Sequence, residues 1–260
     1  MAFFKSIVAI LLTSSLFIAC EEEQTAAPTN PRILNLQATG DAANELLSAD
    51  EYRSITLELV SVKGFEPTAQ AIDNFVDFIE ERTFKPGGVR LLQRSIDSPN
   101  EENLTIEEVD ELEKKNRTVY SDATNHAIYV YFADAENIKT AESRNNQGNE
   151  RQIILGTAYR NTSMVIYEKT LRDITQLRPN SLPNTETSIL NHEFGHLLGL
   201  VNLGTPMVVP HEAESEDEEK HCNVEGCLMQ ANFQSAMLNS DTILQLDSLC
   251  IQDLRANGGR

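Results

Sequence analysis

Positive charge is scarce in this 260-residue chain. There are 21 Lys and Arg against 40 Asp and Glu, so the formal net charge is −19. Binding to nucleic acid requires clustered cations that neutralise phosphates, and adhesion to anionic lipid requires basic segments. The composition therefore disfavours both partners. Otherwise 40% apolar and 23% charged residues are ordinary for a soluble globular protein that is long enough to bury a core.

The N-terminus lacks an apolar run long enough to span a bilayer comfortably. Lys5 is followed by a short apolar run over residues 7–12, and a second apolar stretch ends at Ala19. This layout is typical of a secretory signal peptide over residues 1–19. We therefore expect the chain to be exported.

The end of this leader, Leu16-Phe17-Ile18-Ala19-Cys20, resembles a bacterial lipobox, although Phe17 and Ile18 depart from its commoner residues. In lipoproteins of this kind the leader is cut before the Cys, whose thiol is then lipidated. The resemblance implies lipidation at Cys20 and a place in the bacterial cell envelope. The protein would be lipid-anchored to the outer membrane, facing the periplasm or the surface. The alternative is an ordinary signal peptide with an incidental Cys.

Large apolar residues are few between residues 20 and 50, where Glu, Ala, Thr and Asn predominate. Such a composition favours disorder and predicts a polar tether over 20–50. The rest, 51–260, is expected to form one domain, with an N-terminal sheet subdomain (51–200) and a C-terminal subdomain (201–260).

Strand and helix patterns alternate through the first part of this domain, and no internal repeat is visible. Alternation with period two predicts strands, and apolar spacing of three and four predicts helices. The order predicts an α/β (α+β) fold with a mixed sheet. The expected strands cover 54–62, 89–92, 127–132, 153–159 and 164–167, and the expected helices cover a stretch from Pro67 to a stop at Gly87-Gly88 and residues 104–115.

Residues 160–163 are expected to form the turn of a hairpin between the last two strands. The hairpin lies just before the segment that carries the strongest motif. It is therefore a candidate sheet edge, where a peptide can add as an extra strand.

The strongest motif is His192-Glu193-Phe194-Gly195-His196, preceded by a predicted stop and cap at 183–185. Apolar residues at helical spacing predict a helix, which places His192 and His196 one turn apart on one face. Both imidazoles can then reach one tetrahedral zinc ion. Glu193, beside the first ligand, is placed to act as the base that takes a proton from zinc-bound water.

Gly199 follows the motif and allows a sharp turn at the end of the helix. This arrangement resembles the metzincin peptidases, whose pattern is His-Glu-x-x-His-x-x-Gly-x-x-His. Here the last position holds Asn202, a poor zinc ligand, so the simple pattern fails at this point.

A second match lies downstream and resembles the archaemetzincin branch of that family. There the third His is followed by Cys, four residues, Cys, one residue and Met. Every one of these positions is present here after an insertion of 18 residues, 203–220. The matching residues are His221, Cys222, Cys227 and Met229.

The resemblance implies a zinc metalloendopeptidase that acts on peptide or protein substrates and holds one Zn²⁺ per chain. Its metal ligands would be His192, His196 and His221, its catalytic base Glu193, and its apolar floor beneath the metal Met229. It also implies a metzincin-like sandwich with a mostly parallel sheet, an active-site helix and a small C-terminal subdomain.

Cysteines are few: besides Cys20 there are only Cys222, Cys227 and Cys250. Cys222 and Cys227 are close in sequence and are expected to pair, although pairing of Cys250 with either remains open. The paired downstream cysteines of archaemetzincins are reduced here to Cys250. A Cys222–Cys227 disulfide is therefore expected in place of the second, all-cysteine zinc site of that branch.

Three alternatives stay open. His211, within the insertion, competes with His221 as third ligand. The acidic run over 212–219 is interpreted as a solvated loop, with calcium binding as the other interpretation. A catalytically degenerate zinc- or peptide-binding surface lipoprotein is the alternative to the peptidase, and a nutrient-binding or adhesion lipoprotein with a chance motif is a third hypothesis.

Overall fold

The computed structural model describes residues 30, 32–145, 153–231 and 242–260. The predicted signal peptide 1–19, the predicted lipidation site Cys20 and residues 21–29 of the predicted tether lie outside the described residues. Within the described ranges, no helix is both long enough and apolar enough to cross a membrane.

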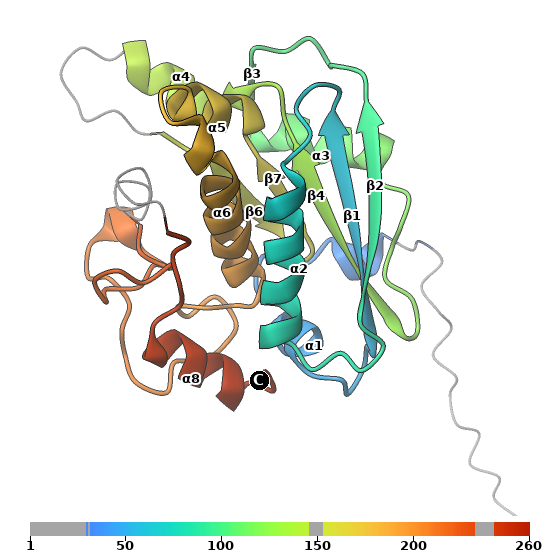
Figure 1. Cartoon of the computed structure of the whole chain (residues 1–260). Helices are drawn as coiled ribbons and strands as arrows, with labels where there is room; N and C mark the ends of the chain where they lie inside the picture. The colour runs from blue at the N-terminus through green and yellow to red at the C-terminus, as the bar shows by residue number, and fades with distance from the viewer. Residues whose placement is uncertain (1–29, 31, 146–152, 232–241) are drawn as a thin grey trace, which may run out of the picture.

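A five-stranded sheet forms the centre of the molecule (Figure 1). Its order is β2-β1-β4-β7-β6, and all neighbours are parallel except β6 and β7, which form an antiparallel hairpin. This confirms the mixed, mostly parallel sheet, and β6 lies at one edge. The strands are β1 (Ser54–Val62), β2 (Val89–Ile96), β4 (Asn125–Phe132), β6 (Gly156–Arg160) and β7 (Ser163–Ile166).

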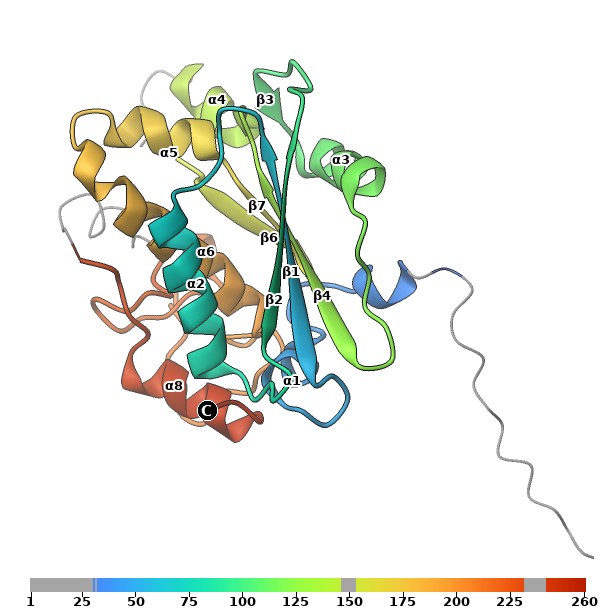
Figure 2. The same cartoon turned by 45° about the vertical axis from the view of Figure 1, so that its right-hand side comes forward.

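The central strands β1, β4 and β7 are buried on both faces of the sheet, as is typical of parallel strands. Alternate residues of the central strands enter two separate cores: Ile55, Leu57 and Leu59 of β1 face one, while Val60 and Val62 face the other. Figure 2 shows α2 (Ala69–Arg82) and α6 (Leu182–Leu197) covering the first face and α3 (Ile106–Asn116) covering the second. The result is a three-layer sandwich.

Local signals explain where the principal helices begin and end. Thr68 caps α2 and accepts from the Ala71 N–H, and α3 begins with a complete capping box formed by Thr105 and Glu108. The predicted stop of α2 at Gly87-Gly88 is wrong, because the helix already ends at Arg82. The glycines instead form the turn into β2.

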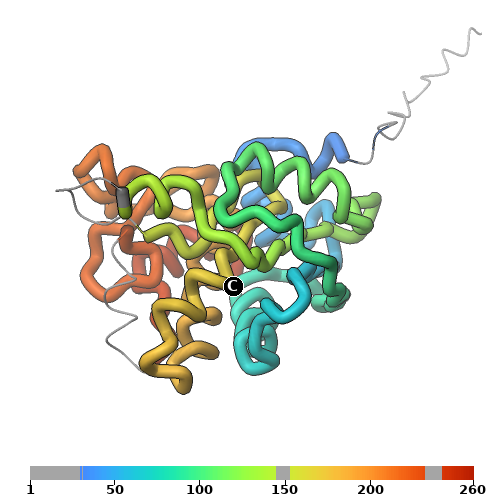
Figure 3. The backbone as a smooth tube through the Cα atoms, turned by 90° about the horizontal axis from the view of Figure 1, so that it is seen from above, coloured from blue at the N-terminus to red at the C-terminus, as the bar shows by residue number. Residues whose placement is uncertain are grey.

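Short elements complete the fold. Figure 3 shows the orange segment that follows residue 200 gathered at one side of the molecule. The remaining elements are η1 (Ile33–Asn35), α1 (Ala43–Leu47), β3 (Asn103–Leu104), β5 (Glu136–Asn137), α4 (Ile138–Asn145), α5 (Glu168–Thr175), η2 (Pro179–Ser181), η3 (Glu216–Glu218) and α8 (Ser248–Ala256).

The N-terminal segment differs from the predicted tether. Residues 32–50 pack onto the domain, where Leu46 and Leu47 of α1 are fully buried in the larger core. The buried Asn35 side chain donates to Ser121 and Thr162. The polar composition did not predict this packing, because the packing depends on only a few apolar residues on a single short helix. The tether prediction therefore needs correction over residues 32–50.

Candidate metal centre

Helix α6 carries the His-Glu-x-x-His motif and packs against α2. The ring of Phe194 meets those of Phe75 and Phe78 edge to face, at centroid distances of 5.5 and 6.4 Å. The helix begins at Leu182, with Pro183 in its first turn, so the predicted stop and cap at 183–185 is placed too late. Proline is tolerated there because first-turn N–H groups have no partner within the helix.

The chain turns sharply at Gly199, which has a left-handed φ of 72°. A Cβ at this position would lie 2.6 Å from the Thr205 nitrogen and 2.7 Å from the Ala43 Cβ. Only glycine therefore fits both the conformation and the space. Asn202, where the simple metzincin pattern places its third ligand, is exposed and donates to Glu212 at 3.4 Å.

Three imidazoles meet beside α6. The ligand atoms of His192, His196 and His221 lie within 4.8 Å of one another. The Nε2 atoms of His192 and His196 are 3.1 Å apart, whereas two nitrogens on one tetrahedral zinc lie about 3.3 Å apart. The insertion thus returns His221, and not His211, to the motif helix. His211 lies in a different cluster of side chains.

Hydrogen bonds orient two of these rings. The Nδ1–H groups of His192 and His221 donate to the carbonyl oxygens of Leu228 and Glu219, each at 2.8 Å. A neutral imidazole that donates through Nδ1 keeps a lone pair on Nε2, which is the usual outer-shell pattern of metal-bound histidine. Nδ1 of His196 is buried and has no hydrogen-bond partner among the described residues.

Burial also keeps the three rings neutral. It lowers the pKa of His192 to about 3 and the pKa of His196 well below its ordinary value, and it lowers the pKa of His221 as well. The neutral imidazole is the form that binds metals. The donor set therefore fits a zinc ion.

Glu193 turns from the helix toward the edge strand β6. Its Oε2 accepts the Ala158 N–H at 2.8 Å. Burial raises the pKa of the Glu193 carboxyl to about 8, and the Ala158 N–H opposes that rise. A Cβ at Gly156 would lie 2.7 Å from the Glu193 Cγ and Oε1, so the glycine makes room for the carboxylate.

Met229 is fully buried and lies against α6 at Gly195. A Cβ at Gly195 would overlap the Met229 sulfur, which explains the small residue inside the motif. The residue before Met229 supplies the carbonyl that orients His192. Met229 therefore packs against the motif helix, next to the residue that orients His192.

The predicted Cys222–Cys227 disulfide is not formed. Cys222, Cys227 and Cys250 are buried free thiols, and the Cys227 sulfur lies 3.7 Å from that of Cys250. Sequence spacing alone could not show that α8 returns Cys250 to the pair. Within the described residues, the acidic run 212–219 is exposed or half-buried and supplies none of the side-chain groups that could hold a metal ion.

Several groups at the centre were not predicted from the sequence. Gly156 had a signal, since an isolated glycine in a strand marks a bulge or a close approach. The Ala158 N–H and the carbonyl oxygens of Leu228 and Glu219 had no signal in the sequence. Backbone groups of this kind are present at almost every position of a chain, so the sequence does not mark the ones that act at a site.

Comparison by sequence gives no match, either to a protein-family model or to a curated protein. Comparison of structures finds a crystal structure of archaemetzincin from Methanopyrus kandleri. The TM-score is 0.51 at 15% sequence identity, and the match covers 79% of this chain and 96% of the other. The chain therefore has an α/β, metzincin-like fold similar to that of archaemetzincin.

Proposed function

We propose that the protein is a zinc-dependent metalloendopeptidase, held in the bacterial cell envelope by a lipid on Cys20. The observation that carries the peptidase proposal is the convergence of His192, His196 and His221 beside the buried carboxyl of Glu193. The anchor rests on the lipobox resemblance alone. The fold likeness to archaemetzincin supports the proposal.

Bound zinc would supply a Lewis acid that polarises the scissile carbonyl and lowers the pKa of water. The three histidines would hold it through Nε2. Glu193 would take the proton of the attacking water on a carboxylate oxygen and deliver it to the leaving amine nitrogen. Its hydrogen bond to the Ala158 N–H keeps the carboxyl at the sheet edge.

A peptide substrate would add along β6. This strand pairs with β7 on one side and is the last strand of the sheet on the other. Main-chain hydrogen bonds from an added strand provide affinity without demanding a sequence. Because Glu193 is bonded to the same strand, a peptide bond on β6 would lie next to the base.

The first test uses the purified full chain and a mixture of unstructured peptides. Zinc-loaded protein is expected to cleave them. Removing zinc with a chelator should abolish cleavage, and adding zinc back should restore it, whereas a serine-protease inhibitor should have no effect. Intact peptides in the presence of fully zinc-loaded protein would contradict the proposal and favour a zinc- or peptide-binding lipoprotein.

Gly156→Ala tests the link between the edge strand and the base. The added methyl group should push the Glu193 carboxylate out of position, and a misplacement of about 1 Å can cost about 100-fold in rate. We expect peptide cleavage to fall by about this factor while zinc content and thermal stability stay close to wild type. An unchanged rate would show that Glu193 does not act from this position.

A further inference from the structure

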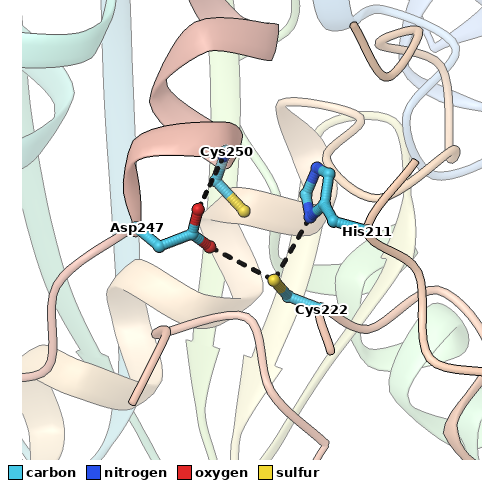
Figure 4. A group of neighbouring side chains, drawn as sticks. All are labelled: His211, Cys222, Asp247 and Cys250. Atoms are coloured by element: carbon cyan, nitrogen blue, oxygen red, sulfur yellow. Dashed lines mark hydrogen bonds between the residues drawn. The ribbon is translucent and has the colours of Figure 1, made fainter. Parts of the chain in front are cut away.

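A second cluster of metal-type ligands lies apart from the three histidines. It joins His211 of the insertion, Cys222, and Asp247 and Cys250 at the start of α8 (Figure 4). Their ligand atoms all lie within 4.8 Å of one another. The sulfur of Cys222 is 3.2 Å from His211 Nδ1 and 3.2 Å from Asp247 Oδ2.

The imidazole of His211 is already held as a metal ligand would be. Its Nε2 lies 2.7 Å from Asp253 Oδ2, and both side chains are 1% exposed. If Nε2–H donates to that carboxylate, the lone pair on Nδ1 faces Cys222. A carboxylate behind a histidine is the common outer shell of a bound metal, because it fixes the tautomer and the ring.

Hydrogen bonds alone do not satisfy this cluster well. Cys222 has one thiol proton, yet it faces two acceptors, His211 Nδ1 and Asp247 Oδ2. The other oxygen of Asp247 caps α8 by accepting the N–H groups of Leu249 and Cys250, which leaves Oδ2 for a ligand. A cation at the centre would satisfy all of these acceptors at once.

Backbone N–H groups donate to two of the sulfurs in this region. The Val224 N–H donates to the Cys222 sulfur at 3.4 Å, and the Met229 N–H donates to the Cys227 sulfur at 3.3 Å. Cys227, whose sulfur is 3.7 Å from that of Cys250, borders the cluster.

We propose that His211, Cys222, Asp247 and Cys250 form a second zinc site. Cys, His and Asp side chains are all known zinc ligands, and four protein ligands are the number that a structural zinc site requires. The set differs from the all-cysteine site of archaemetzincins, because a histidine from this chain's insertion and a carboxylate take part. The site goes beyond the proposed peptidase activity, which needs only the three-histidine centre.

The second zinc would fix the segment that carries His221. Cys222 follows His221 directly and donates its N–H to the Met229 oxygen at 2.7 Å. A metal that holds Cys222 therefore holds the backbone of the third histidine and the turn beneath the motif helix. It also ties the insertion to α8.

The test measures metal content and the spectrum of the cobalt-loaded full chain. Wild type is expected to bind two metal ions and to show thiolate-to-cobalt charge-transfer absorption. His221→Ala should bind one and keep this absorption. His211→Ala combined with Cys250→Ser should bind one and lose most of it. The two variants thus serve as controls for each other.

The wild-type measurement alone keeps the inference testable if the double variant does not fold. One metal ion per chain and no thiolate absorption would overturn the second site, even if the protein cleaves peptides. Conversely, thiolate absorption in His221→Ala would uphold the second site even if no peptide is cleaved. A failure of the second zinc site can therefore be distinguished from a failure of the proposed peptidase activity.

Discussion

Glu193→Gln is expected to lower the rate of peptide cleavage by about 100- to 10,000-fold, the usual contribution of a general acid–base group. Gln has the same shape and can still accept the Ala158 N–H with its amide oxygen, but it cannot take up a proton. The proposed metal ligands are the three clustered histidines and not Glu193. The zinc content of the variant should therefore not change. Initial rates on one defined peptide, with zinc measured on the same samples, check this.

Glu186→Gln is the matched control. Glu186 is also a buried carboxyl on α6, but it accepts the backbone N–H and hydroxyl of Thr68 and so belongs to the contact between α6 and α2. We expect this variant to cleave at close to the wild-type rate. Equal losses in both variants would mean that α6 was disturbed as a whole and would remove the case for Glu193 as the base.

His221→Ala is expected to remove the metal from the three-histidine centre. Losing only an outer-shell partner of a ligand costs about 10- to 100-fold in metal affinity, so losing a ligand should cost more than about 100-fold. Zinc titration against a competing chelator would measure the change, and peptide cleavage should be lost in parallel.

Asn202→Gly is the comparison for that variant. Asn202 has a left-handed φ of 64°, a conformation that glycine adopts without strain. Its side chain donates to Glu212 at the surface and is not among the clustered histidines, so the affinity for zinc should not change. If Asn202→Gly weakened zinc binding as much as His221→Ala, the assignment of His221 as the third ligand would be wrong.

The sheet and the main helices could be predicted because their signals are local. Period-two alternation predicted β1, and a continuous apolar run predicted β4. The apolar face of α2 predicted a helix, although not where it ends. The His-Glu-x-x-His spacing placed two histidines on one helix face for the same reason. Each of these features depends on neighbours within a few residues.

The rest depended on contacts between distant segments. The resemblance to the archaemetzincin pattern favoured His221 over His211, but the local sequence of the 18-residue insertion does not show which of them returns to the helix. The structure places them in two different clusters. Nor does the polar composition of residues 32–50 show that two leucines complete the core. The disulfide prediction failed likewise, because Cys250 approaches Cys227 from 23 positions away.

The packing of α1 also governs when the protein can finish folding. Asn44 donates to the Asn257 oxygen at 2.8 Å, across 213 positions of sequence, and Leu47 and Leu254 share one core. Contacts between such distant segments form slowly, since a large loop must close first. The first helix therefore cannot reach its final environment until α8 has been synthesised. The part of the core that α1 and α8 share is therefore completed late. Until then, the growing chain exposes apolar residues that this core later buries.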